Sequence, residues 1–388
     1  MEVHLAQRLE KLPPYIFAAI EKLKKEAKSK GADLIDLSIG DPDMPTPEYI
    51  VKAMQSAVAN PKNHQYPSYE GMPAFKEAVA NWYRRRFNVN LDPSKEVISL
   101  IGSKEGIAHT PLAFINPGET VLCPCPAYPV YSISTYFADG NVYFMPLKEE
   151  NSFFPDFSSI PEAVLKNAKL MFLNYPNNPT SASCTESNFK QAIEIALKYN
   201  IIICHDAAYT EVYYDGKKPQ SFLEIDGAKE VGIEYHSLSK SYNMTGWRIG
   251  FACGNKDIIA GLGKIKTNVD SGVFQAIQEA GITALNSDEN ALSYIRDVYQ
   301  KRRDILHKGL NSIGLNVNKP EAAFYLWTKV PKSFPKSSDF IILLLNNAHV
   351  LATPGNGFGD CGEGYIRFAL TVDVDRLEEA VKRIKKTL

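Results

Sequence analysis

The stretch Ser237-Leu-Ser-Lys-Ser-Tyr-Asn-Met-Thr-Gly-Trp-Arg-Ile-Gly250 lies between two apolar runs of the sequence. Those runs, 231–236 before it and 249–253 after it, have the length and composition of buried strands. The connection carries two hydroxyl groups, an amine, a guanidinium and two glycines, at Ser237, Ser239, Lys240, Arg248, Gly246 and Gly250. Polar and flexible residues between two buried strands predict a functional loop at the edge of a sheet.

The residue types in this loop suit two chemical tasks. Lys240, on a turn beside small hydroxyl residues, can reach a carbonyl carbon and form a Schiff base. The hydroxyls of Ser237 and Ser239 and the Arg248 guanidinium suit a phosphate dianion, because arginine offers two parallel N–H donors. An amine beside a phosphate cradle is what pyridoxal 5'-phosphate requires. A lone lysine in a polar loop would simply be solvated, but the ordered set favours the functional interpretation.

Ser-x-Ser-Lys followed by Gly-x-Arg, with Arg248 eight residues after Lys240, resembles the cofactor-lysine motif of fold-type I (class I/II) pyridoxal phosphate aminotransferases. Other parts of the family pattern recur in the same order, namely Asn177-Asn-Pro-Thr180, Asp206-Ala-Ala-Tyr209 and a late Arg367. The resemblance covers nearly the whole chain and is strongest to the LL-diaminopimelate aminotransferases and their near relatives. It implies an aspartate aminotransferase-like fold, bound pyridoxal phosphate and a homodimer.

The composition excludes several classes of function. The chain has 388 residues, 45% of them hydrophobic, which is enough for a large core in two or three domains. Its 43 basic and 44 acidic residues leave a net charge of -1, so nothing indicates nucleic acid or an anionic membrane surface as a partner. No apolar run approaches the roughly 18 residues of a membrane span, and the N-terminus lacks a signal-peptide pattern. We expect a cytoplasmic protein.

The six cysteines do not have the spacing of a zinc site or a disulfide framework. Cys123 and Cys125 form a Cys-x-Cys pair, and the other four are scattered. Cys204 and Cys253 lie within apolar runs, where a buried and reduced thiol is expected. The sequence therefore predicts no bound metal and no disulfide.

Strands and helices alternate between about residues 97 and 253. This alternation predicts an α/β fold whose mainly parallel sheet is sandwiched by helices. The candidate cofactor residues follow the ends of the expected strands, where open α/β sheets bind their ligands. The resemblance further implies a large cofactor-binding domain over 45–285 and a smaller, discontinuous α+β domain over 1–44 and 286–388.

Three residues that follow the first strands complete the expected cofactor site. Gly102 and Ser103 open a helical stretch, and the free N–H groups and dipole at such a helix start favour anions. We therefore expect Ser103 and Lys104 to form a second phosphate clamp. Tyr128 lies in a Pro-rich turn, where it could be an ordinary surface residue, but the resemblance favours stacking on the cofactor ring. Lys104, Tyr128 and Asn178 are expected to contact the substrate as well.

Asn178, Asp206 and Tyr209 are assigned to the polar atoms of the cofactor ring. The Asn178 amide can hydrogen-bond the phenolic oxygen. Asp206 follows a buried strand, where a carboxylate needs a partner, and the ring nitrogen supplies one. An aspartate in this sequence can also cap a helix. Tyr209 can reach the opposite edge of the ring. The family usually has glycine where this chain has Ser181.

Arg367, Gly40 and Tyr15 are assigned to the substrate. Arg367 lies in a strand expected over 364–369, and by alternation alone it could point outward. The resemblance implies instead that it holds the substrate α-carboxylate with two parallel hydrogen bonds. Gly40 follows a strand expected over 35–39 and is an ordinary turn residue by sequence alone. The resemblance places Gly40 at the substrate carboxylate, and Tyr15 is assigned on the same ground.

Tyr66 and Asn268 are assigned to the active site of a neighbouring subunit. In the family, a tyrosine five residues before a glycine reaches the phosphate bound by the partner, and Tyr66 has this spacing to Gly71. A polar residue at the position of Asn268 is implied to reach the same phosphate. The resemblance thus implies a homodimer whose active sites need residues from both subunits.

The implied reaction is transfer of an amino group from an amino acid to a 2-oxo acid. Lys240 binds the cofactor aldehyde, is displaced by the amino acid and then moves the proton from Cα. Asp206 keeps the ring nitrogen protonated, and Tyr209 assists at the ring. Two substrates that bind in turn give ping-pong kinetics. A carbon–sulfur β-lyase would share every cofactor residue and remains an alternative, whereas no feature favours a coenzyme A-dependent acyltransferase or a DNA-binding regulator.

LL-diaminopimelate with 2-oxoglutarate is the expected substrate pair. This amino acid carries a second ammonium and a second carboxylate, and a buried site must pair both charges. Tyr15, Lys104 and Glu70 are candidate partners. Plant-type members of the family have an acidic residue two places before Gly71, whereas this chain has Tyr69 there and its acid at Glu70. A broader enzyme for alanine, aspartate, glutamate or aromatic amino acids is therefore the second possibility.

Overall fold

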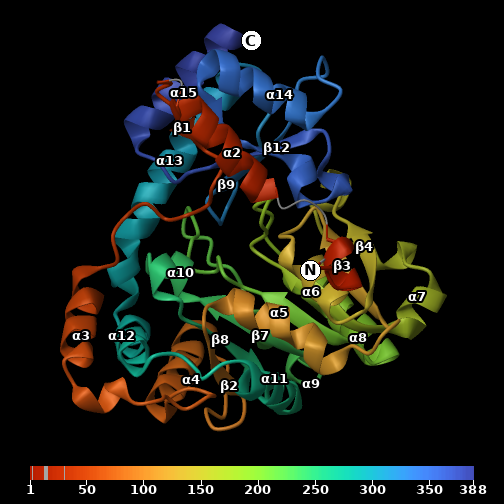
Figure 1. Cartoon of the computed structure of the whole chain (residues 1–388), viewed down its shortest axis with the longest axis vertical. Coiled ribbons are helices and arrows are strands. Elements are labelled where there is room, and N and C mark those ends of the chain that lie inside the picture. The colour runs from red at the N-terminus through yellow and green to blue at the C-terminus, as the bar shows by residue number, and fades with distance from the viewer. Residues whose placement is uncertain (2, 13–15, 30) are drawn as a thin grey trace.

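The structure is a computed structural model, and it describes residues 1, 3–12, 16–29 and 31–388. A seven-stranded sheet occupies the larger part of the molecule, and two smaller sheets lie above it in Figure 1. The strands are β1 (Ile35–Asp36), β2 (Val97–Leu100), β3 (Thr120–Cys125), β4 (Asn141–Pro146), β5 (Ala168–Asn174), β6 (Ile202–Asp206), β7 (Gly232–Ser237), β8 (Gly250–Gly254), β9 (Tyr325–Lys329), β10 (Val350–Leu351), β11 (Thr353–Pro354) and β12 (Tyr365–Ala369).

Helices surround these sheets on several sides (Figure 1). The α-helices of the described residues are α1 (Gln7–Glu10), α2 (Ile16–Ser29), α3 (Glu48–Val58), α4 (Pro73–Phe87), α5 (Ser103–Phe114), α6 (Val130–Phe137), α7 (Glu162–Asn167), α8 (Glu186–Tyr199), α9 (Ala228–Val231), α10 (Leu238–Ser241), α11 (Lys256–Val269), α12 (Gln275–Leu285), α13 (Ser293–Ser312), α14 (Ser337–Leu343) and α15 (Val374–Thr387). A π-helical turn, η7 (Leu344–Ala348), continues α14, and a short 3-10 helix, η8 (Gly355–Phe358), precedes β12.

The large sheet has the strand order β2-β8-β7-β6-β5-β3-β4. The pairings from β7 through β6, β5 and β3 to β4 are parallel, whereas β8 runs antiparallel to both β7 and β2. The expected α/β class with a mainly parallel sheet is therefore confirmed. Parallel strands place their carboxyl ends at the same edge of the sheet, so the loops that follow them gather there.

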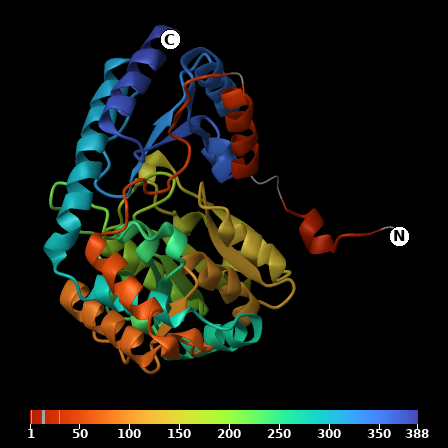
Figure 2. The same cartoon turned by 60° about the vertical axis from the view of Figure 1, so that its left-hand side comes forward.

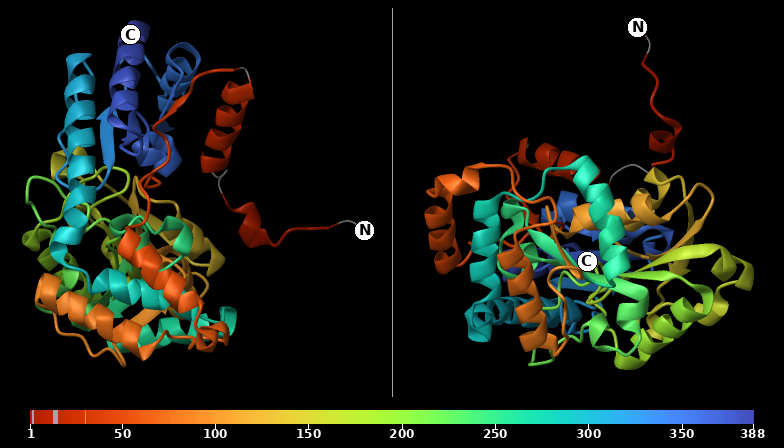
Figure 3. Two further views of the ribbon diagram at one scale, coloured as in Figure 1. Left: turned by 90° about the vertical axis from the view of Figure 1, so that its left-hand side faces the viewer. Right: turned by 90° about the horizontal axis from the view of Figure 1, so that it is seen from below.

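Both faces of the large sheet are buried, as a parallel sheet requires. Successive residues of β5 point to opposite faces. Leu170 and Phe172 pack in the core beneath α5, α6 and α11, whereas Met171 and Leu173 belong to the core shared with α4 and α8. Figure 3 shows helices on both sides of the sheet. Continuous apolar strands thus arise because every side chain of a central strand is buried.

Segments from distant parts of the chain build the two smaller sheets. Residue Ile35 of β1 pairs in parallel with Val350 of β10, and β9, β11 and β12 form an antiparallel sheet. Helices α13 and α15 pack on one another beside these sheets. Ile39 and Gly40, which follow β1, therefore lie beside residues more than 280 positions later in the chain, such as Tyr325.

The sequence pattern does not predict β4. Its residues 141–146 lie at the edge of the sheet, where only Met145 is buried and Phe144 is 43% exposed. An edge strand covered on few sides lacks the continuous apolar run that marks the central strands. The apolar residues 322–327 also predict a strand, but in the structure β9 begins only at Tyr325.

Helix α1 and its neighbouring residues project from the body of the molecule (Figures 2 and 3). Three apolar side chains on this arm, Val3, Leu5 and Leu9, are between 41% and 71% exposed. Within the part of the chain that the structure describes, no helix is long and apolar enough to cross a membrane.

Candidate active site

A cavity of about 380 Å³ opens between the large sheet and the smaller sheets. It lies at the carboxyl ends of β5, β6 and β7, whose last residues, Asn174, Asp206 and Ser237, line it. The cavity brings together most of the residues that the sequence assigns to cofactor and substrate: Gly40, Ser103, Lys104, Tyr128, Asn178, Asp206, Tyr209, Ser237, Ser239, Lys240, Arg248 and Arg367. Segments up to 327 residues apart in the chain thus meet in one place.

Two other assigned residues that the structure describes do not line this cavity. Tyr66 is 90% exposed, and the exposed Asn268 donates its amide to the Lys264 carbonyl at 2.7 Å. Their assignment to the site of a second subunit stays a prediction. Tyr15 lies outside the described residues. Glu70, a candidate for the distal charges of the substrate, points toward Lys76 at 3.7 Å and is also outside the cavity.

Lys240 stands at the centre of the cavity. It belongs to the single-turn helix α10, which starts directly where β7 ends. Its Nζ donates to the Gly40 carbonyl at 3.0 Å. Burial, together with the nearby Arg248 and Arg367, lowers the pKa of Lys240 to about 8. A larger fraction of this amine than of an ordinary lysine is then uncharged near neutral pH, and a nucleophile that attacks a carbonyl must be uncharged.

Hydroxyl and guanidinium groups form an anion-binding end of the cavity. Ser237 accepts a hydrogen bond from the Ser239 backbone at 3.2 Å, while the buried Ser239 Oγ has no partner among the described residues. Arg248 packs closely against Gly102, the residue that precedes α5. A Cβ on Gly102 would come within 2.2 Å of Arg248 Nη2. A buried hydroxyl without a partner costs about 1–3 kcal/mol. The donor set fits a phosphate group.

Asp206 lines the cavity at the carboxyl end of β6. Its Oδ2 accepts from the Tyr131 hydroxyl at 2.8 Å and its Oδ1 from the Ala208 backbone at 3.3 Å. Burial raises the pKa of Asp206 above its usual range. Residues 208–211 form a turn and no helix follows Asp206, so the alternative that Asp206 caps a helix is wrong. A protonated ring nitrogen would supply the positive partner that this carboxylate lacks.

Asn178 is fixed by a residue that the sequence analysis did not assign. Its backbone N–H donates to Asn174 Oδ1 at 2.8 Å, and Asn174 Nδ2 donates to the Asp206 carbonyl at 2.8 Å. Asn174 is the last residue of β5, just as Asp206 is the last of β6. A polar side chain at the end of a buried strand is the signal that could have identified Asn174.

Arg367 is 1% exposed and points into the cavity, so the alternative of an outward-facing strand residue is wrong. Its Nη1 donates to Asn178 Oδ1 at 2.7 Å and its Nη2 to the Ser38 carbonyl at 2.6 Å. The guanidinium contacts two aromatic rings, with Cζ 4.2 Å from the centroid of Tyr325 and 4.7 Å from that of Phe358. Its Nε is buried and unpartnered among the described residues. This geometry fits a carboxylate ligand.

Several further residues line the cavity without a sequence assignment: Ile39, Asn174, Ala208, Thr245 and Tyr325. Tyr325 begins β9, an apolar strand whose pattern indicates only a core position. Its hydroxyl lies 2.9 Å from that of Tyr209. Contacts of this kind join positions 116 residues apart and leave no local pattern in the sequence.

Ser181 takes the backbone conformation that glycine usually supplies in the family. Its φ of 58° lies in the left-handed region, which costs a residue with a side chain about 1 kcal/mol. The Ser181 hydroxyl donates to the Tyr325 carbonyl at 2.9 Å. This bond offsets the strain and ties the loop that carries Asn178 to β9.

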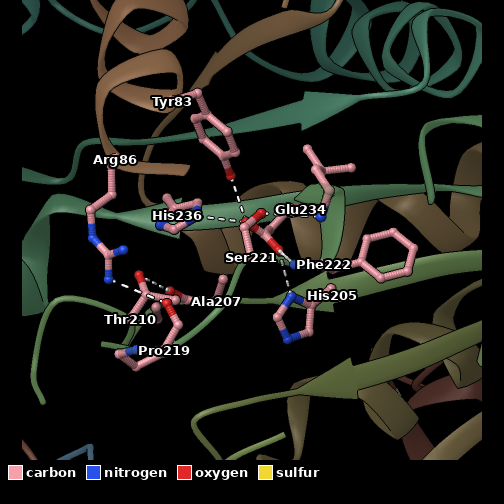
Figure 4. A network of polar contacts seen from close by, with 12 residues as sticks. Tyr83, Arg86, His205, Ala207, Thr210, Pro219, Ser221, Phe222, Glu234 and His236 are labelled. Carbon is pink, nitrogen blue, oxygen red and sulfur yellow. Dashed lines mark hydrogen bonds and ion pairs between the residues drawn. The ribbon is translucent and has the colours of Figure 1, made fainter. Parts of the chain in front are cut away.

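A second polar cluster lies behind the cavity, on the other face of β6 and β7 (Figure 4). Its centre is Glu234, which is fully buried. The carboxylate accepts five hydrogen bonds, from Tyr83 (2.7 Å), Ser221 (2.7 Å) and His236 (3.0 Å) at Oε1, and from His205 (2.8 Å) and the Phe222 backbone (2.8 Å) at Oε2. We call these six residues the Glu234 network.

The Glu234 network holds an ionised carboxylate without access to water. His205 Nε2 accepts from the Tyr175 backbone at 3.2 Å, so its Nδ1 carries the proton given to Glu234. Burial alone would raise the pKa of Glu234, but hydrogen bonds from His205 and His236 hold it well below its usual range. His205 therefore lies in this network rather than in the cavity.

Comparison with known proteins agrees with this geometry. The sequence matches the family described as aminotransferase class I and II over residues 32–384. The chain is similar to two proteins named LL-diaminopimelate aminotransferase, from Nitratidesulfovibrio vulgaris (58% identity over 381 residues) and Aquifex aeolicus (57% over 380). Each alignment covers 98% of this chain and 98% of the relative.

A solved structure has the same fold. Substrate-bound BacF from Bacillus subtilis is 38% identical, with a TM-score of 0.95 and an alignment that covers 100% of this chain and 98% of that one. Family match, relatives and fold all extend over nearly the whole sequence. The chain therefore belongs to the class I and II aminotransferases.

Proposed function

We propose that this protein is a pyridoxal phosphate-dependent aminotransferase that takes the amino group of LL-diaminopimelate and gives it to 2-oxoglutarate. The carrying observation is the cavity in which Lys240, Asp206, Arg248 and Arg367 converge. Support for the substrate comes from the relatives that bear this name at 57% and 58% identity. Composition and free thiols support a cytoplasmic location.

The residues of the cavity fit one orientation of the cofactor. Ser103, Ser237, Ser239 and Arg248 would hold its phosphate, because their donors gather at one end and Ser239 Oγ lacks a partner among the described residues. Asp206 at the other end would hold the proton of the ring nitrogen. Further contacts are assigned to Tyr128 over the ring face and to Asn178 and Tyr209 at the phenolic oxygen.

Pyridoxal phosphate, when bound, supplies an aldehyde that couples to amines and a ring that accepts the electron pair left at the substrate Cα. Arg367 binds the α-carboxylate and so orients the Cα–H bond toward Lys240. The Lys240 amine would accept that proton from Cα as a general base and return it as a general acid. Asp206 stays ionised beside the ring nitrogen and keeps it protonated. The second half-reaction uses the same groups in reverse with 2-oxoglutarate.

We also propose a homodimer with shared sites and a division into a large domain (45–285) and a small discontinuous domain (1–44 with 286–388). Tyr66 and Asn268 would reach the phosphate bound by the partner, which agrees with their exposure on this chain. The exposed apolar arm around α1 offers a further contact surface. The pairing of β1 with β10 supports the discontinuous small domain.

The substrate proposal is tested by comparing donors at a fixed concentration of 2-oxoglutarate. We expect kcat/KM for LL-diaminopimelate to exceed that for alanine, aspartate or phenylalanine by at least about tenfold, since pairing both distal charges is worth more than one contact. Equal kcat/KM values for all donors would indicate an aminotransferase of broad specificity. Pyruvate and ammonia from cystathionine without a 2-oxo acid would indicate a β-lyase instead.

The shared site is tested by mixing two impaired variants, Lys240→Ala and Tyr66→Phe, under conditions in which subunits exchange. A mixed dimer contains one site with both Lys240 and Tyr66 intact. Recovered activity above that of either parent supports the dimer, and its absence despite proven exchange contradicts it.

A further inference from the structure

Tyr325 joins two parts of the cavity that come from different sheets. It is 2% exposed and begins β9 of the small antiparallel sheet, whereas Tyr209 belongs to the turn after β6. The two hydroxyl oxygens lie 2.9 Å apart. On its other side, the Tyr325 ring covers the guanidinium of Arg367 at 4.2 Å. One side chain thus contacts both the expected cofactor tyrosine and the expected carboxylate-binding arginine.

The direction of the hydrogen bond between the two tyrosines follows from the number of protons. Burial raises the pKa of Tyr209 and of Tyr325 above the usual range, so each hydroxyl keeps its single proton at neutral pH. If Tyr209 donates into the cavity to the phenolic oxygen of the cofactor, it can only accept from Tyr325. Hydrogen bonds in series polarise one another. Donation by Tyr325 would therefore strengthen the bond that Tyr209 donates.

The ring of Tyr325 acts on Arg367 in a different way. Together with the ring of Phe358, whose centroid lies 4.7 Å from Cζ, it restricts the orientation of the guanidinium. Such contacts contribute about 0.5–2 kcal/mol each. The edges of the guanidinium remain for hydrogen bonds to Asn178, to Ser38 and to a carboxylate.

The surroundings hold Tyr325 in this position from both ends. Its backbone carbonyl accepts the Ser181 hydroxyl at 2.9 Å. A Cβ on Gly40 would lie 2.0 Å from the Tyr325 hydroxyl oxygen, so only glycine at position 40 admits this approach. Gly40 also accepts from Lys240 Nζ. Close packing therefore holds the Tyr325 hydroxyl between Gly40 and Tyr209.

We propose that Tyr325 is a positioning residue that couples the two halves of the site: its hydroxyl orients and polarises Tyr209, and its ring orients Arg367. This inference rests on the proposed function, because the partner of Tyr209 in the cavity is taken to be the phenolic oxygen of pyridoxal phosphate. It adds a residue from the small sheet to a set of cofactor contacts otherwise contributed by the large sheet.

The hydroxyl is tested by a double-mutant cycle of Tyr209→Phe and Tyr325→Phe on the holoenzyme. The readout is the pH midpoint of the visible absorption band, which depends on how well the phenolic anion is stabilised. We expect Tyr325→Phe to raise the midpoint by about 0.5 pH unit, because weaker donation by Tyr209 stabilises the anion less. In the Tyr209→Phe background, Tyr325→Phe should have no further effect. The charged groups that act on Tyr325, namely Arg367, Asp41 and Asp206, are unchanged in every variant.

The ring is tested by comparing Tyr325→Phe with Tyr325→Leu. The phenylalanine variant keeps an aromatic face over Arg367, so KM for the amino acid should stay within about twofold of the wild type. The leucine variant loses that face, and we expect KM to rise about tenfold, as the loss of a buried cation–π contact implies. Equal KM values for the two variants would overturn this part of the proposal.

Tyr214→Phe is the matched control, because Tyr214 is buried, donates its hydroxyl to the Ala323 carbonyl and does not line the cavity. It should leave the absorption midpoint unchanged. The proposal is overturned if Tyr325→Phe leaves the midpoint within 0.1 unit of the wild type, if the cycle is additive, or if Tyr214→Phe shifts the midpoint as much. A wild-type protein that shows no visible band would overturn the proposed function itself, and this inference with it.

Discussion

Two sets of buried polar side chains lie on opposite faces of β6 and β7 and differ in how completely their hydrogen bonds are made. Adjacent residues of β6 show the contrast. His205 points to the face of the sheet that α8 covers, where the carboxylate of Glu234 accepts hydrogen bonds from five donors. Asp206 points to the cavity, where it accepts hydrogen bonds from the Tyr131 hydroxyl at 2.8 Å and from the Ala208 backbone at 3.3 Å.

The cavity side is under-satisfied in other places as well. Ser239 Oγ and Arg367 Nε are buried without partners among the described residues, while Lys240 has a lowered pKa. Such groups do not stabilise the fold, because a buried donor without a hydrogen-bond partner costs about 1–3 kcal/mol. We infer that the Glu234 network, whose carboxylate has five donors, stabilises the strand ends. The polar residues of the cavity, by contrast, obtain their missing partners from ligands.

The largest expected effect is that of Lys240→Ala. Removing the amine eliminates both the covalent attachment of the cofactor and the proton transfer at Cα, so kcat/KM should fall by at least about 10⁴-fold. The variant should keep the wild-type thermal midpoint, since Lys240 makes a single hydrogen bond in the cavity, to Gly40. Borohydride reduction followed by peptide mapping should label Lys240 in the wild type. Label on a different lysine would contradict the assignment.

The next effect is the pH dependence of Lys240 in the cofactor-free protein. Because burial lowers its pKa to about 8, its uncharged fraction at pH 7 exceeds that of an ordinary lysine by about a hundredfold. Labelling of Lys240 by an amine-selective reagent, mapped by mass spectrometry, should reach half its maximal rate near pH 8, and the exposed Lys52 serves as the comparison site in the same peptide map. The sign for stability follows: the unfolded chain binds the proton more tightly between pH 8 and about 10.4, so unfolding free energy rises with pH there.

Glu234→Gln should destabilise the fold with little change at the cavity. An amide nitrogen would face donors where an anion now accepts five hydrogen bonds, and we expect the free energy of unfolding to fall by about 3 kcal/mol. The wild-type contribution is present above the unfolded pKa of about 4.3 and is lost as pH falls through the lower folded pKa, so the variant should lose less stability on acidification.

Glu224→Gln is the control for this substitution. Glu224 is partly exposed and accepts from the Ser221 backbone, so its loss should cost about 1 kcal/mol or less. Denaturant unfolding measures both variants. A rise in KM or a loss of cofactor affinity in Glu234→Gln protein that is still folded would show that the Glu234 network acts on the cavity directly.

Arg367→Lys tests whether the guanidinium in the cavity binds a carboxylate. Lysine keeps the charge but cannot form two parallel hydrogen bonds to a carboxylate or lie flat between Tyr325 and Phe358. We expect KM for the amino acid to rise about thirtyfold, equivalent to roughly 2 kcal/mol, with kcat reduced much less. Initial-rate kinetics decide this, and an unchanged KM would remove Arg367 from the substrate-binding set.

The smallest expected effect concerns Ser181. Glycine at this position removes both the strain at φ of 58° and the hydrogen bond to Tyr325, so stability should change by less than about 1 kcal/mol. Alanine loses the bond and keeps the strain, and should be less stable than glycine by about 1 kcal/mol. Thermal unfolding of the two variants gives the order, and the reverse order would show that the left-handed turn is not strained.

Local sequence was sufficient for the central strands and for the residues that end them. Runs such as that of β6 are apolar throughout because both faces of the sheet are covered, and the polar residue that follows each run marks the edge where ligands bind. The same rule fails for β4, whose edge position leaves residues such as Phe144 exposed. It also passes over Asn174, because an asparagine at a strand end equally suits an ordinary turn.

By itself, the sequence determined which chemical groups are present and in what order, from Gly40 through Lys240 to Arg367, because motif spacing within one turn is a local property of the chain. Only the tertiary structure decided what those groups meet. The 2.9 Å contact of Tyr209 with Tyr325 and four of the five contacts of Glu234 join positions 12 to 151 residues apart, whereas the fifth donor, His236, is two residues from Glu234 on the same strand. Whether a buried polar side chain is saturated or left for a ligand depends on these long-range contacts, since hydrogen-bond partners are counted in space and not along the chain.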